Sequence, residues 1–308
     1  MNGWYEMVNR KILITGAGGF TGWHACQYFL NNGYHVVGLV RKKRFNKDLP
    51  NYEEWECDLT DEFSVYDTIK AIKPDYILHT AGKNDVKESW EKPAEYVTVN
   101  VLATVHLLEA VRKVKNNGKT LVIGSALEFD PSGLPNHPYG LTKTFQSLVA
   151  KSWETLFHLP IMIAKPTNLI GPGPSNGFCS LIAEKIALAE KDGLAEPVLI
   201  DDLTQERDFL DVRDAVRAYE LILLKGKIGE VYPIGTGCYR TLMNVIDSYQ
   251  SLTTVPVPVH IKANKHDLGI DKGKGRMDLT NIRALGWHPG YPFLSSLSDI
   301  LTYYRNKG

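Results

Sequence analysis

The chain has 308 residues, of which 44% are hydrophobic and 23% charged, as in an ordinary soluble globular protein. Its 35 basic and 35 acidic residues balance, which gives no overall electrostatic reason to bind nucleic acid or an anionic membrane. The four cysteines form no C-x-x-C pair, no segment is apolar enough to span a bilayer, and residues 1–10 lack a signal-peptide layout, so we expect a cytoplasmic protein without a metal.

Strands and helices are expected to alternate along the first half of the chain. Short apolar runs bounded by turn residues predict buried strands, and longer segments between them predict the connecting helices. The expected strands cover residues 11–14, 34–40, 52–57, 75–79, 120–124 and 161–164, and the expected helices cover residues 22–32, 61–72, 95–115 and 138–157. This order predicts an α/β fold with a Rossmann-type doubly wound parallel sheet.

The character of the chain changes after Lys165. Proline and glycine crowd residues 166–177, which indicates loops, and residues 230–234 could return to the main sheet as a further strand. We therefore expect a dinucleotide-binding domain at residues 8–166, with a returning segment near residues 207–235. The smaller C-terminal lobe, expected to bind the substrate, would comprise residues 167–206 and 236–308.

A glycine-rich motif at residues 15–22 follows the first expected strand and opens the first expected helix. Gly16 would turn the chain, Gly19 would let the backbone approach a pyrophosphate, and Gly22 would let the helix pack closely. The helix N-terminus would offer N–H groups and partial positive charge to phosphate. In this context the motif predicts a bound dinucleotide, with a glycine turn that binds no ligand as the weaker alternative.

The second expected strand ends in basic residues, where an acidic residue would favour NAD. Arg41, together with Lys42 or Arg44, carries the charge to pair with a 2′-phosphate. NADP(H) is therefore the preferred cofactor, with NAD(H) as the other candidate. A solvated basic loop is the alternative interpretation of this charge run.

Three residues predict proton-coupled hydride chemistry. Tyr139 and Lys143 are four residues apart and would share one helix face, where the ammonium group is expected to lower the pKa of the phenol. Ser125 follows the fifth expected strand, at the sheet edge where α/β proteins bind ligands. We expect Ser125 to orient a substrate oxygen, Tyr139 to exchange the proton, and Lys143 to tune Tyr139 and hold the cofactor ribose. Taken alone, Ser125 would more simply be a turn residue, and Tyr139 with Lys143 would more simply be a pair on a helix surface.

Together these motifs resemble the extended short-chain dehydrogenase/reductase family, whose members act on nucleotide-linked sugars. The family fingerprint T-G-x-x-G-F-x-G stands at residues 15–22, and Y-x-x-x-K stands at residues 139–143. The resemblance implies these cofactor-binding residues: Gly16, Gly18, Gly19, Phe20, Thr21, Arg41, Lys42, Asp58, Leu59, Ala81, Gly82, Tyr139, Lys143 and Pro166. It also implies a structural role for Asn100.

The resemblance further implies a nucleotide-sugar substrate. The substrate-binding residues it implies are Lys83, Ser125, Ala126, Asn168, Gly177, Phe178 and Arg207, with Arg207 approaching the diphosphate. Blocks at residues 72–77, 86–90, 170–178 and 207–219 are similar in particular to GDP-4-keto-6-deoxyhexose reductases, which form GDP-rhamnose. The family often forms homodimers through two long helices, here expected at residues 95–115 and 138–157.

Two departures from the family pattern bear on the expected reaction and on the identity of the nucleotide. Dehydratases need an acid/base pair directly after the serine, and this chain has Ala126 and Leu127, which move no protons. Glu128 follows, and alternation along an extended segment would point it away. The family's Arg-Pro-x-Asp/Glu element is replaced by a Gly/Lys-rich stretch at residues 269–276, which is either a basic loop over a diphosphate or a solvated loop.

The missing acid/base pair leaves simple hydride transfer. The leading hypothesis is NADPH-dependent reduction of a nucleotide-linked 4-keto-6-deoxy sugar, with Tyr139 as proton donor. The second is a sugar-nucleotide epimerase that uses the same residues and retains an oxidised cofactor. The third is a dinucleotide sensor without catalysis, which the intact Ser125, Tyr139 and Lys143 disfavour.

Overall fold

The structure, a computed structural model, describes residues 10–43, 49–193, 196–261 and 276–307. The chain forms two compact units, each described here by itself. The first comprises residues 1–165, 216–233 and 280–287, and the second comprises residues 166–215, 234–279 and 288–308. Residues 207–215, expected in the dinucleotide-binding domain, group with the second unit, and residues 280–287 group with the first. Residues 1–9, Arg44 and residues 269–275 of the Gly/Lys-rich stretch lie outside the described residues.

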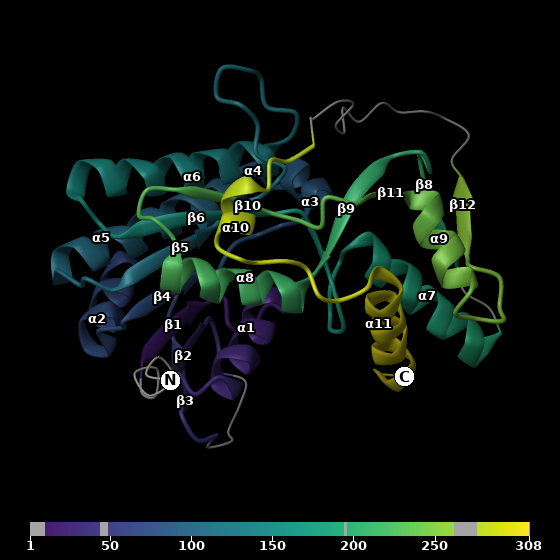
Figure 1. Ribbon diagram of the computed structural model, residues 1–308, viewed down its shortest axis with the longest axis horizontal. Coiled ribbons are helices and arrows are strands. Elements are labelled where there is room, and N and C mark those ends of the chain that lie inside the picture. Colours follow the sequence, from purple (N-terminus) through teal and green to yellow (C-terminus); the bar gives the residue numbers. More distant parts are fainter. Residues whose placement is uncertain (1–9, 44–48, 194–195, 262–275, 308) are drawn as a thin grey trace. The chain divides into compact units, whose positions relative to one another are not determined.

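A seven-stranded sheet organises the first unit (Figure 1), in the order β10-β6-β5-β4-β1-β2-β3. Its strands are β1 (Lys11–Thr15), β2 (His35–Val40), β3 (Tyr52–Glu56), β4 (Tyr76–His79), β5 (Lys119–Ile123), β6 (Ile161–Pro166) and β10 (Val231–Ile234). All pairings from β6 across to β3 are parallel. The predicted doubly wound sheet is thereby confirmed, including the return of residues 230–234 beside β6.

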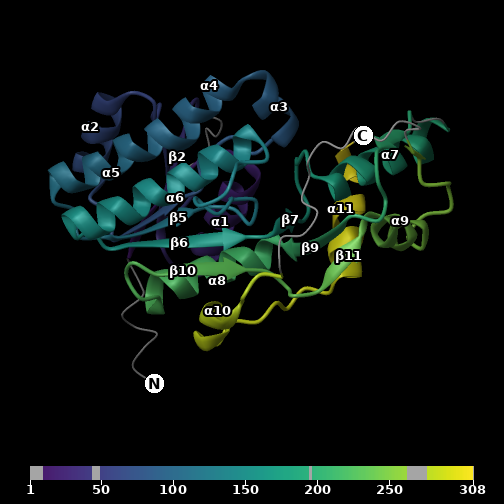
Figure 2. The ribbon, with the colours of Figure 1, turned by 90° about the horizontal axis from the view of Figure 1, so that it is seen from above.

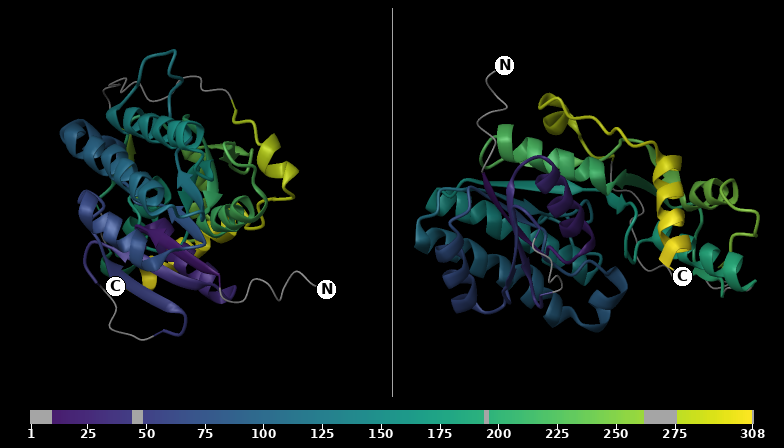
Figure 3. Two further views of the ribbon diagram at one scale, coloured as in Figure 1. Left: turned by 90° about the vertical axis from the view of Figure 1, so that its left-hand side faces the viewer. Right: turned by 90° about the horizontal axis from the view of Figure 1, so that it is seen from below.

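Helices cover both faces of this sheet (Figure 2). They are α1 (Phe20–Asn31), α2 (Glu62–Ile72), α3 (Val86–Glu91), α4 (Pro93–Tyr96), α5 (Ala103–Val114), α6 (Pro138–Phe157), α8 (Val212–Lys225) and α10 (Thr280–Ala284). The helices α2, α5 and α6 pack on one face, whereas α1 and α8 lie together on the other (Figure 3). Glu220 of α8 joins them, because it accepts hydrogen bonds from Tyr28 at 2.6 Å and Tyr34 at 2.9 Å.

The core of the first unit explains why these elements form. Strand residues such as Leu13, Ile77 and Val122 are fully buried, as are Leu107 and Val111 of α5. Buried strands of a parallel sheet need apolar residues on both faces, and the helices need only one apolar stripe. The predicted helix at residues 138–157 matches α6 at both ends, since Pro138 suits a first helical position.

One expected helix is wrong in detail. Instead of one regular helix at residues 95–115, the chain forms α4, then a π-helical stretch η1 (Val97–Leu102), then α5. The preceding helix α3 was not predicted. A π-helical turn widens the helix locally and often marks a functional site. Here it carries the buried Asn100, whose contacts are described below.

The second unit has small sheets and three helices in its described part. A three-stranded sheet has the order β11-β9-β7, and β12 pairs with β8. The elements are β7 (Asn168–Ile170), α7 (Phe178–Asp192), β8 (Val198–Ile200), β9 (Glu206–Asp211), β11 (Tyr239–Thr241), α9 (Leu242–Gln250), β12 (Val259–Ile261) and α11 (Phe293–Lys307). Residues including Ile182, Phe209 and Ile300 form its own apolar core. Across the described residues of both units, no helix combines the length and hydrophobicity needed to traverse a membrane.

Candidate active site

The carboxyl ends of the parallel strands collect the predicted cofactor-binding residues of the first unit. Loops leaving β1, β2, β3, β4 and β5 lie at one edge of the sheet, because the strands run in the same direction. These loops carry Gly16, Gly18 and Gly19, then Arg41 and Lys42, then Asp58 and Leu59, then Ala81 and Gly82, and finally Ser125. Phe20 and Thr21 begin α1, and Pro166 ends β6 at the start of the second unit.

The turn after β1 requires its glycines. Gly16 has a φ of +67°, and a Cβ there would lie 2.8 Å from the Cα of Ala81. A Cβ on Gly22 would lie 2.1 Å from the carbonyl oxygen of Gly16, so the first turn of α1 closes directly on the loop. The N-cap of α1 is Gly19, and no side chain caps the helix. This cradle of backbone N–H groups without a bulky side chain fits a dinucleotide pyrophosphate.

The loops beside the glycine turn are tied to it or expose charge. The Ala81 N–H donates to Thr15 Oγ1 at 3.1 Å, and Thr80 Oγ1 donates to the Thr15 carbonyl at 2.6 Å. Asp58 is exposed, and its hydrogen bonds from Thr60, with the charge of Arg41, lower the pKa of its carboxyl group. Arg41 and Lys42 are exposed as well. A carboxylate and two cations therefore flank the position that an adenosine moiety would take.

Ser125, Tyr139 and Lys143 are all buried, and Ser125 contacts Tyr139. A hydrogen bond with Ser125 lowers the pKa of Tyr139, but burial outweighs it and raises the pKa to about 12. The expected lowering of this pKa by Lys143 is therefore wrong for the protein by itself, since desolvation dominates. Burial also lowers the pKa of Lys143 to about 8, although the charge of Glu128 counters this effect.

Lys143 is held by neutral acceptors. Its Nζ donates to the carbonyl oxygen of Ile123 at 2.5 Å and to Oε1 of Gln146. Two of its three N–H bonds are thus directed by the protein. Gln146 was not predicted, and its position three residues after Lys143 on the same helix is the signal that was available.

A chain of buried hydrogen bonds runs from Lys143 to the glycine turn. Gln146 donates from Nε2 to Thr104 Oγ1 at 2.9 Å, and Thr104 donates to the Asn100 carbonyl at 2.8 Å. Thr104 must therefore accept from His79 Nε2 at 2.9 Å, which leaves Nδ1 of His79 to accept from Thr15 Oγ1 at 2.8 Å. The tautomer of His79 is assigned from this network. Burial, with the charge of Lys143, lowers the pKa of His79 to about 3, so the ring is neutral.

Asn100 joins the loop after β4 to the helix that carries tyrosine and lysine. Its Oδ1 accepts from the Lys83 N–H at 2.7 Å, and its Nδ2 donates to the Lys83 carbonyl and to Thr142 Oγ1, each at 3.0 Å. The π-helical turn supplies the local geometry for these bonds. Lys83 itself points its ammonium to Glu88 at 3.0 Å and Glu95 at 2.8 Å. The charge that was expected to meet substrate is therefore paired within the first unit.

The segment after Ser125 is a turn, and the expected extended geometry is wrong. The Glu128 N–H donates to the Ser125 carbonyl at 3.3 Å, and Ala126 and Leu127 occupy the turn. Glu128 is consequently directed inward. Its carboxylate accepts from the Ser125 N–H at 2.9 Å and from Ser147 Oγ at 2.8 Å, and it pairs with Lys165 at 2.7 Å.

The predicted residues in the second unit gather around the start of α7. Gly177 is the N-cap of α7, without a side-chain cap, and Phe178 is the first helical residue. Arg207 of β9 is half-buried, and its charge lowers the pKa of Cys179 in the first turn of α7, although burial raises that pKa to about 12 overall. Asn168 donates from Nδ2 to the Asp208 carbonyl at 3.1 Å, which fixes β7 beside β9.

Two neighbouring arginines of the second unit have opposite environments. Arg213 makes two hydrogen bonds to Asp211, at 2.9 and 2.7 Å, pairs with Asp299 at 2.8 Å and covers the ring of Tyr291. Arg207 donates to Gln205 at 3.1 Å, and no carboxylate of the described residues pairs with it. Burial lowers the pKa of Arg207. Arg207 thus has charge to offer an anion, whereas Arg213 is neutralised.

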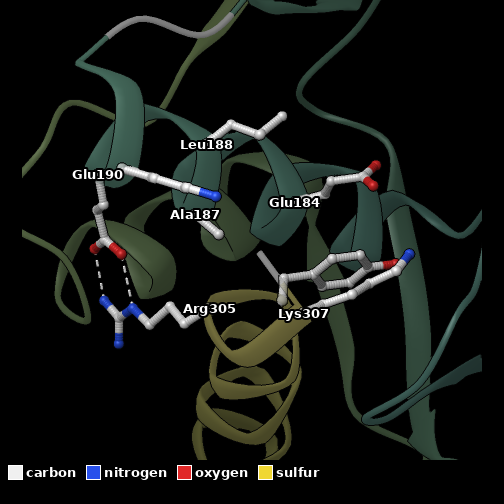
Figure 4. Close-up of a pocket in the computed structure, with 8 residues that line it drawn as sticks. Glu184, Ala187, Leu188, Glu190, Arg305 and Lys307 are labelled. Carbon is white, nitrogen blue, oxygen red and sulfur yellow. Dashed lines mark hydrogen bonds and ion pairs between the residues drawn. The ribbon is translucent and has the colours of Figure 1, made fainter.

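A hollow in the second unit contains none of the predicted site residues. A pocket of about 430 Å³ lies between α7 and α11 (Figure 4), with Glu190 and Arg305 joined across it at 2.6 Å. A smaller one of about 280 Å³ is lined by residues that include Phe209, Arg240 and Tyr291. Among the described residues no group of three or more histidine, cysteine, aspartate or glutamate side chains is placed to hold a metal ion.

The fold and the geometry of the site define the class of protein. A doubly wound sheet with a glycine turn and a buried serine–tyrosine–lysine set is typical of an oxidoreductase that binds a nicotinamide dinucleotide. The model of the NAD dependent epimerase/dehydratase family matches residues 12–235. The chain therefore belongs to this family of enzymes that act on sugar nucleotides with NAD(P).

Relatives within the family catalyse different reactions. The chain is 27% identical to GDP-6-deoxy-D-mannose reductase of Pseudomonas aeruginosa, over 97% of this chain and 99% of that protein. It is 26% identical to dTDP-glucose 4,6-dehydratase of Haemophilus influenzae, over 96% of this chain and 97% of that protein. These relatives support the family and leave the particular reaction to be argued from the site.

Solved structures resemble this chain over nearly its whole length. MoeE5 in complex with UDP-glucose and NAD superposes with a TM-score of 0.80 at 27% identity, covering 96% of this chain and 99% of that one. RMD from Pseudomonas aeruginosa, complexed with NADPH, superposes with a TM-score of 0.81 at 24% identity, covering 97% and 99%. The second likeness concerns the fold alone.

Proposed function

We propose that this protein is an NADPH-dependent ketoreductase that acts on a nucleotide-linked 4-keto-6-deoxy sugar. The observation that carries the proposal is the buried set of Ser125, Tyr139 and Lys143 beside a turn whose Ala126 and Leu127 move no protons. The relative of Pseudomonas aeruginosa named GDP-6-deoxy-D-mannose reductase supports the assignment.

The residues present account for the proton that such a reduction needs. When bound, nicotinamide supplies the hydride. Tyr139 is fully protonated at neutral pH, because burial raises its pKa to about 12, and it donates this proton to the oxygen of the reacting ketone. The Ser125 hydroxyl accepts from the Leu127 N–H at 3.0 Å and is hydrogen-bonded to Tyr139, and on substrate binding its proton would turn to polarise the same ketone oxygen. The ammonium of Lys143 stabilises the tyrosinate that remains.

Dehydration is disfavoured by the same turn. Elimination of water across a sugar requires an acid and a base near the serine. Glu128 is the nearest carboxylate in sequence, and its oxygens are bound to Ser125, Ser147 and Lys165. It is therefore engaged in structure and does not face a substrate.

The second unit offers a site for the diphosphate of the substrate. A helix N-terminus with a glycine N-cap and an arginine that no described carboxylate neutralises is a favourable arrangement for an anion. Arg207 and the N–H groups around Gly177 and Phe178 would bind the phosphates, and Asn168 would lie nearby on β7. On the cofactor side, Arg41 and Lys42 favour the 2′-phosphate of NADPH.

A sugar-nucleotide epimerase is the second candidate. MoeE5, at 27% identity, was solved with UDP-glucose and NAD, and an epimerase would use the same serine, tyrosine and lysine. Tightly bound NAD in the purified protein would favour it over the reductase, since a reductase exchanges its cofactor in each turnover.

The first experiment measures NADPH consumption with GDP-, dTDP-, CDP- and UDP-linked 4-keto-6-deoxyhexoses, with NADH in parallel. We expect rapid oxidation of NADPH with one nucleotide. Tyr139→Phe should lower kcat about 1000-fold, the size of a lost general acid, while NADPH still binds. Full turnover by this variant, or no oxidation with any of the four sugars, would exclude the assignment.

We also propose a cytoplasmic homodimer. Phe145, Leu148, Leu156 and Phe157 of α6 are exposed, and large apolar side chains exposed on a helix are suited to pairing with a second copy. Sedimentation of the protein and of its Leu148→Glu variant tests this pairing, with a monomeric variant as the expected result and identical sedimentation as the contrary one.

A further inference from the structure

Glu128 is a buried carboxylate that the proposed reaction does not use. Only 5% of its side chain is exposed, yet it contacts three separate elements of the first unit. These are the turn of Ser125, the helix α6 through Ser147, and the strand β6 through Lys165. Burying a charge costs free energy unless the charge is paired and hydrogen-bonded. The contacts of Glu128 meet both conditions, which indicates a role for its carboxylate.

The backbone beside Glu128 is shaped to receive its carboxylate. A Cβ on Gly124 would lie 2.3 Å from Glu128 Oε1, so only glycine leaves the necessary space at the end of β5. Oε1 accepts both the Ser125 N–H and the Ser147 hydroxyl, and Oε2 pairs with Lys165. Ser147 lies one turn after Lys143 on α6. Glu128 therefore fixes the serine turn against the helix that carries Tyr139 and Lys143.

We propose that Glu128 is a positioning residue that holds the Ser125 turn against α6 and places a negative charge near Lys143. The proposal deepens the proposed function, because a protonated Lys143 is what stabilises the tyrosinate. The electrostatic part is consistent with the neighbouring groups. Burial lowers the pKa of Lys143 to about 8, and the charge of Glu128 raises it against that effect. The same charge contributes to the raised pKa of Tyr139.

Other charged and titratable groups around this cluster are accounted for. Lys165 from β6 pairs with Glu128 itself. His79 from β4 is neutral, with a pKa lowered to about 3. His137 stacks on Tyr139 at 6.0 Å between ring centroids, and Tyr96 meets it edge-on at 6.5 Å. The buried Tyr219 of α8 has a raised pKa, to which Tyr139 contributes, so it stays neutral.

The test titrates Lys143 directly, in the protein without substrate. The ε-carbon resonance of Lys143 is followed by NMR in protein labelled with ¹³C-lysine, and Lys143→Met identifies it. Glu128→Gln keeps the size of the side chain and removes the charge, whereas Glu128→Asp keeps the charge and shortens the reach. We expect the midpoint of Lys143 to fall by roughly one pH unit in Glu128→Gln, as loss of one nearby opposite charge predicts, and to move less in Glu128→Asp.

A purely structural role for Glu128 would lower thermal stability without moving this midpoint. An unchanged midpoint in folded Glu128→Gln therefore overturns the proposal. If Glu128→Gln does not fold, Lys165→Gln decides: losing the cation beside Glu128 should raise the midpoint of Lys143, and a constant or lower midpoint contradicts the proposal. The titration needs no substrate, so absence of reductase turnover would overturn the proposed function and leave this result interpretable.

Discussion

The helices α1 and α7 begin with the same kind of N-cap, but the residues around the two helix starts differ. Each follows a glycine N-cap, Gly19 or Gly177, and neither has a side-chain cap. At α1 close backbone contacts leave no room for a side chain at the glycines. Buried hydrogen bonds from Thr104 through His79 reach Thr15, the residue that precedes the glycine turn. At α7 the backbone is unstrained, and a half-buried arginine lies near the first turn. The comparison teaches that one proposed phosphate site depends on backbone shape, whereas the other depends on charge.

Alanine at one glycine near the start of each helix should separate the two designs most strongly. A Cβ on Gly22 would lie 2.1 Å from the Gly16 carbonyl, so Gly22→Ala must displace the turn. We expect a loss of at least about 3 kcal/mol in the free energy of unfolding and a large loss of NADPH affinity. Gly177→Ala is the matched variant, since its Cβ would meet Ser175 Oγ at an ordinary 3.4 Å. Urea unfolding and NADPH fluorescence titration measure both, and equal losses would refute the distinction.

Acid should lower the stability of the first unit, which contains α1, because His79 becomes protonated on unfolding. Its pKa is lowered to about 3 by burial, against about 6.5 in an unfolded chain, so the unfolded state binds more protons between these values. Stability attributable to neutral His79 is therefore complete above about pH 6.5 and falls as the pH drops toward 3. Acidification from pH 7 to pH 4 should cost about 3 kcal/mol at this residue.

The control for this acid effect is His79→Gln, which can hydrogen-bond to both threonines and does not titrate. Urea unfolding at several pH values should give a flatter curve for the variant than for the wild type, even though the variant starts from lower stability at pH 7. Hydrogen exchange should show α1 opening before α7 in the wild type at pH 4. Parallel stability curves for the two proteins would show that His79 does not carry the effect.

Arg207 should affect the affinity for nucleoside diphosphates at α7 and leave the affinity for NADPH unchanged. Removing a half-buried cation from a phosphate site costs about 2 kcal/mol, or roughly 30-fold in binding. Calorimetry with GDP, UDP and dTDP should show this loss for Arg207→Gln, and NADPH affinity should stay constant. Arg207→Lys keeps the charge without the planar fork and should lose less. A variant that binds every nucleoside diphosphate as well as the wild type would remove Arg207 from the site.

The sequence predicted the local features of the first unit better than its tertiary contacts, for a physical reason. The glycine turn, Ser125, Tyr139 and Lys143 are marked by local spacing, and local spacing also placed α6 correctly. The π-helical turn at Asn100 depends on bonds to Lys83 and Thr142, which are distant in sequence. The links from Gln146 through Thr104 to His79, and the inward turn of Glu128, are likewise tertiary. The pKa of Tyr139 was predicted in the wrong direction because burial is not visible in a motif.

The smallest effect is expected at Arg41, because the charge there is exposed and screened by salt. Arg41→Ala should weaken NADPH binding by about 1 kcal/mol, roughly fivefold, and leave NADH binding unchanged, since only NADPH carries a 2′-phosphate. The preference should shrink further as salt is added to the wild type, whereas the Arg207 effect, being half-buried, should persist. Equal losses of affinity for both cofactors would mean that Arg41 acts through Asp58 and the adenosine that both cofactors share, and not through the 2′-phosphate. That outcome would also remove the main support for NADPH over NADH and would leave the retained-cofactor epimerase as the better hypothesis.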